Sequence, residues 1–309
     1  MARSQKSEVR IQSAIRNRSA ERSRSPQSEI MEWLKSATER LTQVGIGPEA
    51  RSEAEWLLAH VLKVERWKLS IEESLSSLAV ETAECLLERR LSREPLAYVL
   101  GEWAFGEWTI EVSPAVLIPR PETEMLVEQW CQRFRGKGER VRILDMGTGS
   151  GCFAIAAAHF FPRAVIDAVD VSPEALQVAG RNFRRYGLEG RVRLREGSLW
   201  KAVEPEARYH GILANLPYIP SLVIPDLEPE VLAEPAVALD GGADGLELIR
   251  AFAKGLPQHV HPGAVVGLEI GGDQGSRVAD ILTAAGLQEM EVLKDLQGFD
   301  RYVLGEFGG

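Results

Sequence analysis

From Val141 onward, short apolar runs alternate with stretches of helical periodicity, and this alternation constrains the fold more than any other feature. The strand-like runs are residues 141–144, 164–169, 192–194, 211–214 and 264–270, and the helical patterns between them include 173–186 and 246–255. Such alternation is typical of an α/β protein with a parallel sheet and right-handed crossovers. Strands near 289–293 and 301–305 have little sequence between them, so we expect a final antiparallel pair.

The chain before this region has a different pattern. Residues 29 to about 100 keep helical spacing over 30–41, 54–61 and 83–91, which predicts a small helical domain. Trp33, Trp56 and Trp67 are expected in its core, with a role as ligand platforms as the alternative. Residues 103–118 alternate in polarity, which indicates a β-hairpin within a linker at 101–120. A helix to about Phe134 opens the larger domain, residues 121–309.

A glycine-rich loop follows the first strand of the predicted sheet. Asp145-Met146-Gly147-Thr148-Gly149-Ser150-Gly151 opens a helix, and alternating glycines let a backbone approach a ligand closely. A dinucleotide fingerprint starting at Gly147 would need Gly or Ala at position 152, which is Cys152. Asp145 suits a positively charged ligand better than a pyrophosphate. The alternative is a glycine-rich turn in which Asp145 caps the next helix.

Residues at the next two strand ends fit a nucleoside. Asp170 ends the second strand, where a carboxylate can accept hydrogen bonds from both ribose hydroxyls, although a plain strand-end turn is the alternative. Ser198 and Trp200 follow the third strand, where an adenine would lie. Trp200 is either a wall of that pocket or an ordinary core residue.

Asn215-Leu216-Pro217-Tyr218 follows the apolar run 211–214, at the ligand-binding edge of a parallel sheet. A side-chain amide, a fixed proline and an aromatic face at that edge can hold a flat, planar nitrogen group. The alternative is a strand-ending turn in which Asn215 bonds local backbone. Arg120, Thr123 and Glu124 flank the start of a helix near Pro121, and they either form the entry of that helix or close the pocket.

Charge divides the chain into two parts. Residues 1–28 hold seven Lys or Arg and two acidic residues, so the net charge of −9 leaves −14 on residues 29–309. The negative charge of residues 29–309 disfavours binding to a phosphate backbone and favours binding to a basic protein partner. The basic arm, 1–28, has too few apolar residues to fold alone and is expected to be disordered; an over-extended start or a transit peptide are the alternatives.

The cysteine content and the length of the apolar stretches indicate the cellular compartment. Three cysteines far apart in the chain favour neither disulfides nor a metal site, and no apolar stretch is long enough to span a bilayer. We therefore expect a cytoplasmic protein without a metal.

Taken together, these residues resemble the class I S-adenosylmethionine-dependent methyltransferases. More narrowly, the chain resembles the protein-(glutamine-N5) methyltransferases that modify peptide chain release factors (PrmC/HemK type). The resemblance covers about residues 29–305 and rests on segments 93–98, 117–124, 145–151, 215–218, 234–239, 269–271 with Gln274 and Gly275, and 300–301.

The resemblance implies a Rossmann-like sheet, mostly parallel with an antiparallel C-terminal strand, and S-adenosyl-L-methionine as cofactor. The implied cofactor residues are Asp145, Gly147, Thr148, Gly149, Gly151, Asp170, Ser198, Trp200 and Asn215. The loop 215–218, together with Arg120, would receive the glutamine of a Gly-Gly-Gln motif, and the helical domain would dock the release factor. We further expect a monomer that binds neither nucleic acid nor membrane directly.

Two positions depart from the family pattern. Leu216 replaces the first proline of the loop, but it has the same carbonyl, and the following Pro217 favours an extended backbone. Asn215 and Leu216 would then supply two acceptors for the amide hydrogens. Ser198 stands where an aspartate is usual, which puts the binding of the adenine amine in doubt.

Other functions share parts of this pattern. An Asn-x-Pro-Tyr loop also fits exocyclic amines of adenine or guanine, although the acidic body disfavours nucleic acid. A glutamine of a ribosomal protein is another possible target. A binding module without turnover would be expected to lack the acceptor at Asn215, and the glycine spacing disfavours a dehydrogenase.

Overall fold

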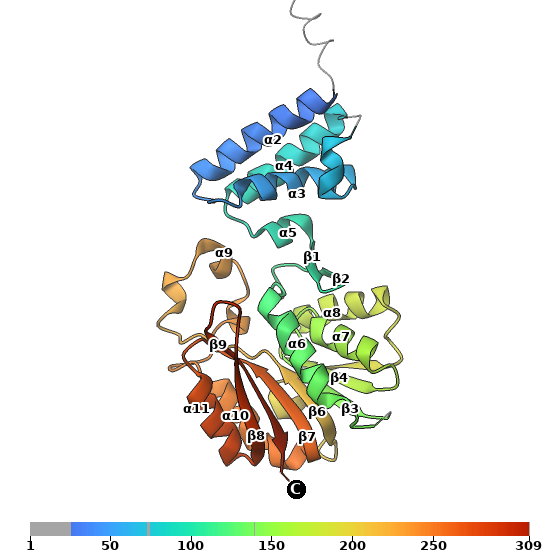
Figure 1. The fold of residues 1–309 in the computed structure, drawn as a ribbon, viewed down its shortest axis with the longest axis vertical. Helices are drawn as coiled ribbons and strands as arrows, with labels where there is room; N and C mark the ends of the chain where they lie inside the picture. The colour runs from blue at the N-terminus through green and yellow to red at the C-terminus, as the bar shows by residue number, and fades with distance from the viewer. Residues whose placement is uncertain (1–25, 73–74, 139, 309) are drawn as a thin grey trace, which may run out of the picture. The chain divides into compact units, whose positions relative to one another are not determined.

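The computed structural model describes residues 26–72, 75–138 and 140–308. These residues divide into two compact units, with the division after Leu100 (Figure 1). Most of the predicted arm, residues 1–25, lies outside the described residues, so the prediction of disorder there stays a prediction. The last three residues of the predicted arm, 26–28, are different: they form the first turn of a helix.

The first unit is helical. Its described elements are α2 (Pro26–Gln43), α3 (Ala50–Leu62), η1 (Arg66–Ser70), α4 (Ser77–Leu91) and α5 (Leu96–Leu100). The three predicted helices are confirmed, while the short elements η1 and α5 were not predicted. Helix α4 begins at a Ser76 cap whose hydroxyl accepts from the Ala79 N–H, a common stabiliser of a helix start.

The tryptophans of this unit only partly follow the prediction. Trp33 is 8% exposed and belongs to the core, as predicted. The prediction is wrong for Trp56 and Trp67, which are 42% and 64% exposed. Arg66 lies 5.0 Å from the Trp56 ring and Lys68 lies 5.2 Å from the Trp67 ring, so each exposed indole is paired with a cation.

The second unit contains a seven-stranded sheet. Its strands are β3 (Arg142–Met146), β4 (Val165–Asp170), β5 (Val192–Glu196), β6 (Tyr209–Ala214), β7 (Val260–Glu269), β8 (Leu287–Lys294) and β9 (Asp300–Phe307). The spatial order is β5-β4-β3-β6-β7-β9-β8. Strands β3 to β7 are parallel, and β9 pairs antiparallel with both β7 and β8. The predicted Rossmann-like sheet with an antiparallel C-terminal pair is confirmed.

The order of the strands reverses beside β3. Chain-consecutive strands β4 and β5 extend to one side of β3, whereas β6 and β7 extend to the other. Ligands of open α/β sheets bind at such a switch point, beyond the carboxyl ends of the strands. The loops that leave β3 and β6 carry the predicted glycine loop and Asn215, so the topology brings these two motifs together.

Helices cover both faces of this sheet (Figure 1). The helical elements are α6 (Pro121–Phe134), α7 (Cys152–Phe160), α8 (Pro173–Arg185), η2 (Leu199–Ala202), η3 (Ile224–Asp226), α9 (Pro229–Leu232), η4 (Ala236–Ala238), α10 (Glu247–His259) and α11 (Gly275–Ala284). Trp130 of α6 packs against Gly211, where a Cβ atom would collide with its ring, and closely against Gly267, where a Cβ atom would lie 3.0 Å from it. On the other face, Ile212 lies in one apolar cluster with Phe252 of α10.

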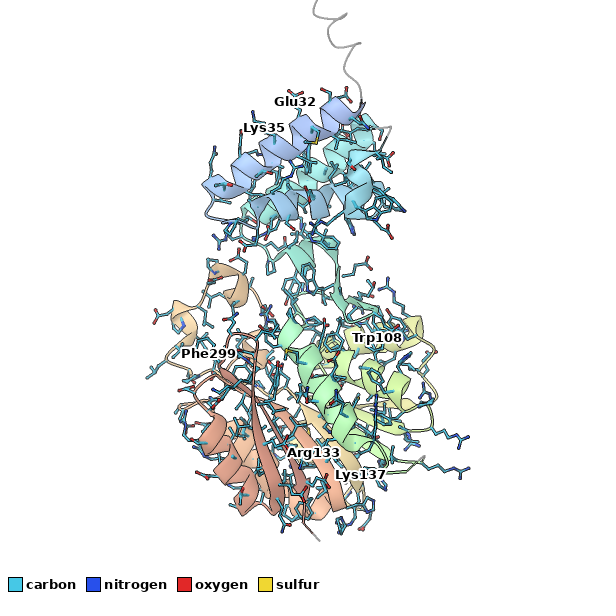
Figure 2. All side chains as sticks on the ribbon, viewed as in Figure 1. Glu32, Lys35, Trp108, Arg133, Lys137 and Phe299 are labelled. Carbon is cyan, nitrogen blue, oxygen red and sulfur yellow. The ribbon has the colours of Figure 1, made fainter. Side chains whose placement is uncertain are left out.

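Cations at the end of α6 tie this helix to the antiparallel pair. Arg133 donates to the Glu289 carbonyl at 2.7 Å, and Lys137 lies 2.6 Å from the Glu306 carboxylate. Figure 2 shows Arg133 and Lys137 near one end of α6. Helix α6 is therefore fastened to β8 and β9 as well as to the centre of the sheet.

A two-stranded hairpin precedes α6. Strands β1 (Glu102–Phe105) and β2 (Trp108–Glu111) pair antiparallel, which confirms the predicted hairpin. Trp108, labelled in Figure 2, contacts the rings of His159 and Phe160 at the end of α7. The prediction that the pattern extends to residue 118 is wrong, because β2 ends at Glu111 and a proline soon follows at 114.

Candidate active site

A cavity of about 300 Å³ opens at the carboxyl ends of β3, β4, β5 and β6. Its walls come from the loops that follow these strands, from residues 115–119 and from the segment around Val237. Predicted site residues that line it are Gly147, Thr148, Gly149, Asp170, Ser198, Asn215, Leu216 and Pro217. Sequence positions up to 70 residues apart thus form one site.

The glycine loop has a backbone that side chains would disturb. Gly147, Gly149 and Gly151 have φ values of 78°, 52° and 86°, in the left-handed region that favours glycine. A Cβ atom on Gly147 would lie 3.4 Å from both the Asn215 carbonyl oxygen and the Leu216 Cδ2 atom. The loop after β3 therefore packs directly against the loop after β6.

Asp145 is buried beneath the loop and does not line the cavity. Its Oδ2 atom accepts from the Thr148 hydroxyl at 2.6 Å and from the Ala154 N–H at 3.1 Å. Burial raises the pKa of Asp145 to about 7, although both hydrogen bonds oppose the shift. Its Oδ1 atom has no hydrogen-bond partner among the described residues. Asp145 shapes the glycine loop and the start of α7.

Asp170 places a carboxylate at the cavity wall. Its two oxygens accept from the Gly149 N–H at 2.8 Å and from the Ser172 N–H at 2.9 Å. Burial raises the pKa of Asp170, and the backbone N–H groups oppose that shift. The same two bonds fix the carboxylate in place, so it can accept hydroxyl groups of a ligand on its remaining lone pairs.

Asn215 and Leu216 bring two hydrogen-bond acceptors to the cavity. Within residues 26–72, 75–138 and 140–308, no hydrogen bond is found to the Asn215 carboxamide or to the Leu216 carbonyl. The Leu216 side chain is 4% exposed and belongs to the apolar cluster under α10. The loop is therefore anchored through an apolar side chain, and its polar atoms stay available to a ligand.

Comparisons with known proteins agree with this arrangement. Residues 32–101 match the PrmC N-terminal domain, and residues 121–242 match the methyltransferase small domain. A release factor glutamine methyltransferase from Moorella thermoacetica is 40% identical over 278 residues, which cover 89% of this chain and 97% of that protein. The chain belongs to the release factor glutamine methyltransferase family.

Further relatives support the family assignment. A release factor glutamine methyltransferase from Geobacter sulfurreducens is 37% identical over 90% of this chain and 96% of that protein. A solved methyltransferase from Pyrococcus furiosus is 22% identical, with a TM-score of 0.51 over 75% of this chain and 99% of that chain, and shares the fold. The chain is thus a methyltransferase. None of the helices in the described ranges could cross a bilayer.

Five predicted site residues do not line the cavity. Asp145 and Gly151 support the glycine loop from below, since a Cβ on Gly151 would lie 2.5 Å from the Phe183 ring. Arg120 precedes α6 and pairs with the buried Glu234. The remaining two are Trp200 and Tyr218.

Trp200 has the contacts of a core residue. Its ring stacks on Phe252 and His259, with ring centroids 5.4 and 4.8 Å apart, and its Nε1–H donates to the Phe252 carbonyl at 2.7 Å. A Cβ on Gly255 would collide with the same ring. This packing under α10 favours the core alternative over a wall of the adenine pocket. The three residues before Trp200, which are Gly197, Ser198 and Leu199, line the cavity.

Tyr218 lies in a polar network behind the cavity. Its hydroxyl donates to Glu269 Oε1 at 3.3 Å, and the Thr123 hydroxyl donates to Glu269 Oε2 at 2.7 Å. Burial and the nearby Glu269 carboxylate raise the pKa of Tyr218.

Sequence reasoning missed part of the cavity wall. Residues 115–119, Val237 and Leu248 line the cavity but carried no predicted role. Thr123, for which pocket closure was one of two alternatives, also lines it, but its partner Glu269 is 146 positions away in the chain. The available signal was the pair of family segments at 117–124 and 234–239, which now lie at the same site.

Proposed function

We propose that this chain transfers a methyl group from S-adenosyl-L-methionine to the side-chain amide nitrogen (N5) of the glutamine in the Gly-Gly-Gln motif of a peptide chain release factor. The observation that carries the proposal is the pair of adjacent acceptors, Asn215 Oδ1 and the Leu216 carbonyl, at a cavity bounded by the glycine loop. A primary amide has two N–H donors on one nitrogen, which this pair of acceptors matches.

The residues present fit S-adenosylmethionine. Gly147 and Gly149 leave backbone without side chains along the cavity, and Asp170 offers a fixed carboxylate to ribose hydroxyls. Asp145 does not line the cavity, and its contribution is to hold the glycine loop in shape through Thr148 and Ala154. The apolar side chains of Val171 and Ala175, which line the cavity, suit the flat faces of an adenine base. When bound, this cofactor supplies an electrophilic methyl group on a sulfonium.

The protein's own groups bind and orient the acceptor. An amide nitrogen is a poor nucleophile because its lone pair is delocalised into the carbonyl. The Asn215 oxygen and the Leu216 carbonyl accept its two N–H groups, fix its direction and favour the positive charge that develops as the nitrogen attacks. Alignment of this kind can contribute on the order of 7–11 kcal/mol. The nitrogen then loses a proton to solvent.

The substrate assignment follows from the family and from charge. The curated relatives are named for a release factor substrate. The charge of −14 on residues 29–309 favours a basic protein over nucleic acid. In this proposal the helical unit, which includes nearly all of the match to the PrmC N-terminal domain, docks the release factor, and the chain acts as a monomer.

A transfer assay tests this function. Purified protein with methyl-labelled cofactor is incubated separately with release factor, a release factor whose Gly-Gly-Gln glutamine is changed to alanine, a ribosomal protein and DNA. Label is expected only in the unaltered release factor, and mass spectrometry should place one methyl group on the glutamine. Label in DNA, or equal label in the altered release factor, would end the assignment.

A further inference from the structure

Two buried side chains hold Tyr218 from behind the cavity. The Gln274 Nε2–H donates to the Tyr218 carbonyl at 2.9 Å, and the Tyr218 hydroxyl donates to Glu269 at 3.3 Å. Gln274 and Glu269 are each 2% exposed. The residue that ends the loop 215–218 is therefore bound through its main chain and through its side chain.

The carboxamide of Gln274 has a defined orientation. Its Oε1 atom accepts from the Gly271 N–H at 2.9 Å, which leaves the nitrogen directed at the Tyr218 carbonyl. Gly271 follows β7, and Gln274 immediately precedes α11. A single amide thus connects the turn after β7 to the loop after β6.

Glycines support the loop from another side. A Cβ on Gly241 would lie 2.8 Å from the Pro217 carbonyl oxygen, and a Cβ on Gly245 would collide with the Tyr218 carbonyl oxygen. The Ile219 N–H also donates to the Leu239 carbonyl at 3.1 Å. The chain just after the two proposed acceptors is held on several sides by groups outside the cavity.

Leu216 explains why such support is needed. A proline at this position would fix its own φ near −65°, whereas the φ of a leucine is not restrained by a ring. The lost restraint must come from contacts, and the contacts of Tyr218 lie two residues after Leu216.

We infer that Gln274 and Glu269 are positioning residues of the amide site: by holding Tyr218 they set where Asn215 Oδ1 and the Leu216 carbonyl lie. The inference rests on the proposed function. Glu269 has a second partner, the Thr123 hydroxyl at 2.7 Å, so it also joins the Tyr218 side chain to a residue of α6 that lines the cavity. Neither Gln274 nor Glu269 lines the cavity, so neither touches the substrate.

Gln274→Glu is the sharpest variant. It keeps the size of the side chain and the acceptor for Gly271, but it turns an oxygen instead of an N–H toward the Tyr218 carbonyl. Gln274→Met removes both bonds without adding charge. Because a misplacement of about 1 Å can cost on the order of 100-fold in rate, we expect kcat to fall by about 10- to 100-fold in both variants. The KM for the cofactor should stay near the wild-type value.

Hydrogen exchange provides a readout that needs no substrate. Amides between residues 213 and 222 are expected to exchange at least about tenfold faster in both Gln274 variants, because local opening becomes easier. Gln177→Glu is the matched control, since Gln177 is an exposed glutamine on α8. It should change neither kcat nor exchange.

The outcomes separate this inference from the proposed function. Absence of label in the release factor with wild-type protein would end the proposed function, while the exchange experiment would still test the loop. Wild-type kcat and exchange in both Gln274 variants would overturn the positioning role. A parallel loss of cofactor affinity and thermal stability would also overturn it, because it would show a general structural role.

Discussion

Asp145 is a single buried acid whose ionisation is linked to folding. Its pKa of about 7 lies above the ordinary value of 3.8, so between these values the folded chain binds more protons than the unfolded chain. The free energy of unfolding should therefore fall as the pH rises from about 4 to about 7, and this contribution should be constant above pH 7.

Asp145→Asn removes this titration and keeps an oxygen acceptor for Thr148 and Ala154. We expect the melting temperature of the variant, relative to wild type, to rise between pH 5 and pH 7 and then to level off. Thermal unfolding of both cofactor-free proteins at matched pH values measures the difference. Parallel curves across this range would contradict the link.

The positions of some site residues could be predicted from the sequence, and those of others could not. Asp170 and Asn215 could be placed correctly because each follows an apolar strand at the binding edge of a parallel sheet. Trp200 could not, because an aromatic residue after a strand can face the cavity or the core. Its direction depends on Phe252 and His259, more than 50 positions later in the chain.

At the scale of elements, one carboxylate joins the entry of α6 to the segment after α9. Buried Glu234 accepts from the Ile118 N–H at 3.0 Å and pairs with Arg120, whose side chain is about one-third exposed. Ile118, which donates to Glu234, and Pro235, which follows Glu234 in the chain, both line the cavity. Glu234 therefore holds two walls of the site together.

Two substitutions separate the parts of this contact. Glu234→Gln keeps an acceptor for Ile118 and loses only a partly exposed ion pair, so we expect a cost below about 1 kcal/mol. Glu234→Ala leaves a buried N–H without a partner, which should cost about 1–3 kcal/mol more. Urea unfolding of both variants checks the order. Equal losses would show that the ion pair, and not the N–H acceptor, dominates.

Strand positions were predictable, but strand order was not. Val192–Glu196 and Tyr209–Ala214 show their apolar or alternating character locally, so their existence followed from the sequence. That β6 lies beside β3, and not beside β5, depends on long-range pairing such as Leu144 with Ile212. Hydrophobic periodicity carries no information about such neighbours.

At the scale of the whole molecule, the basic arm, residues 1–28, differs in the sign of its net charge from residues 29–309. Among the described residues, those that line the cavity all lie between 115 and 248. A variant lacking residues 1–25 keeps all of α2. We expect steady-state methylation of the release factor to be nearly unchanged, and circular dichroism provides the folding control. A collapse in rate with intact folding would instead show that the arm docks the substrate.

The proposed function depends most on the two acceptors at the carboxyl end of β6. Replacing Asn215 with alanine removes one of them and leaves the Leu216 carbonyl in place. Loss of one group that stabilises developing charge typically costs on the order of 100- to 1000-fold in rate. The direct test is a single-turnover measurement of methyl transfer to release factor, with cofactor binding measured by calorimetry in the same variant. We expect transfer to be at least about 100-fold slower with cofactor still bound, and transfer at the wild-type rate would contradict the proposed function.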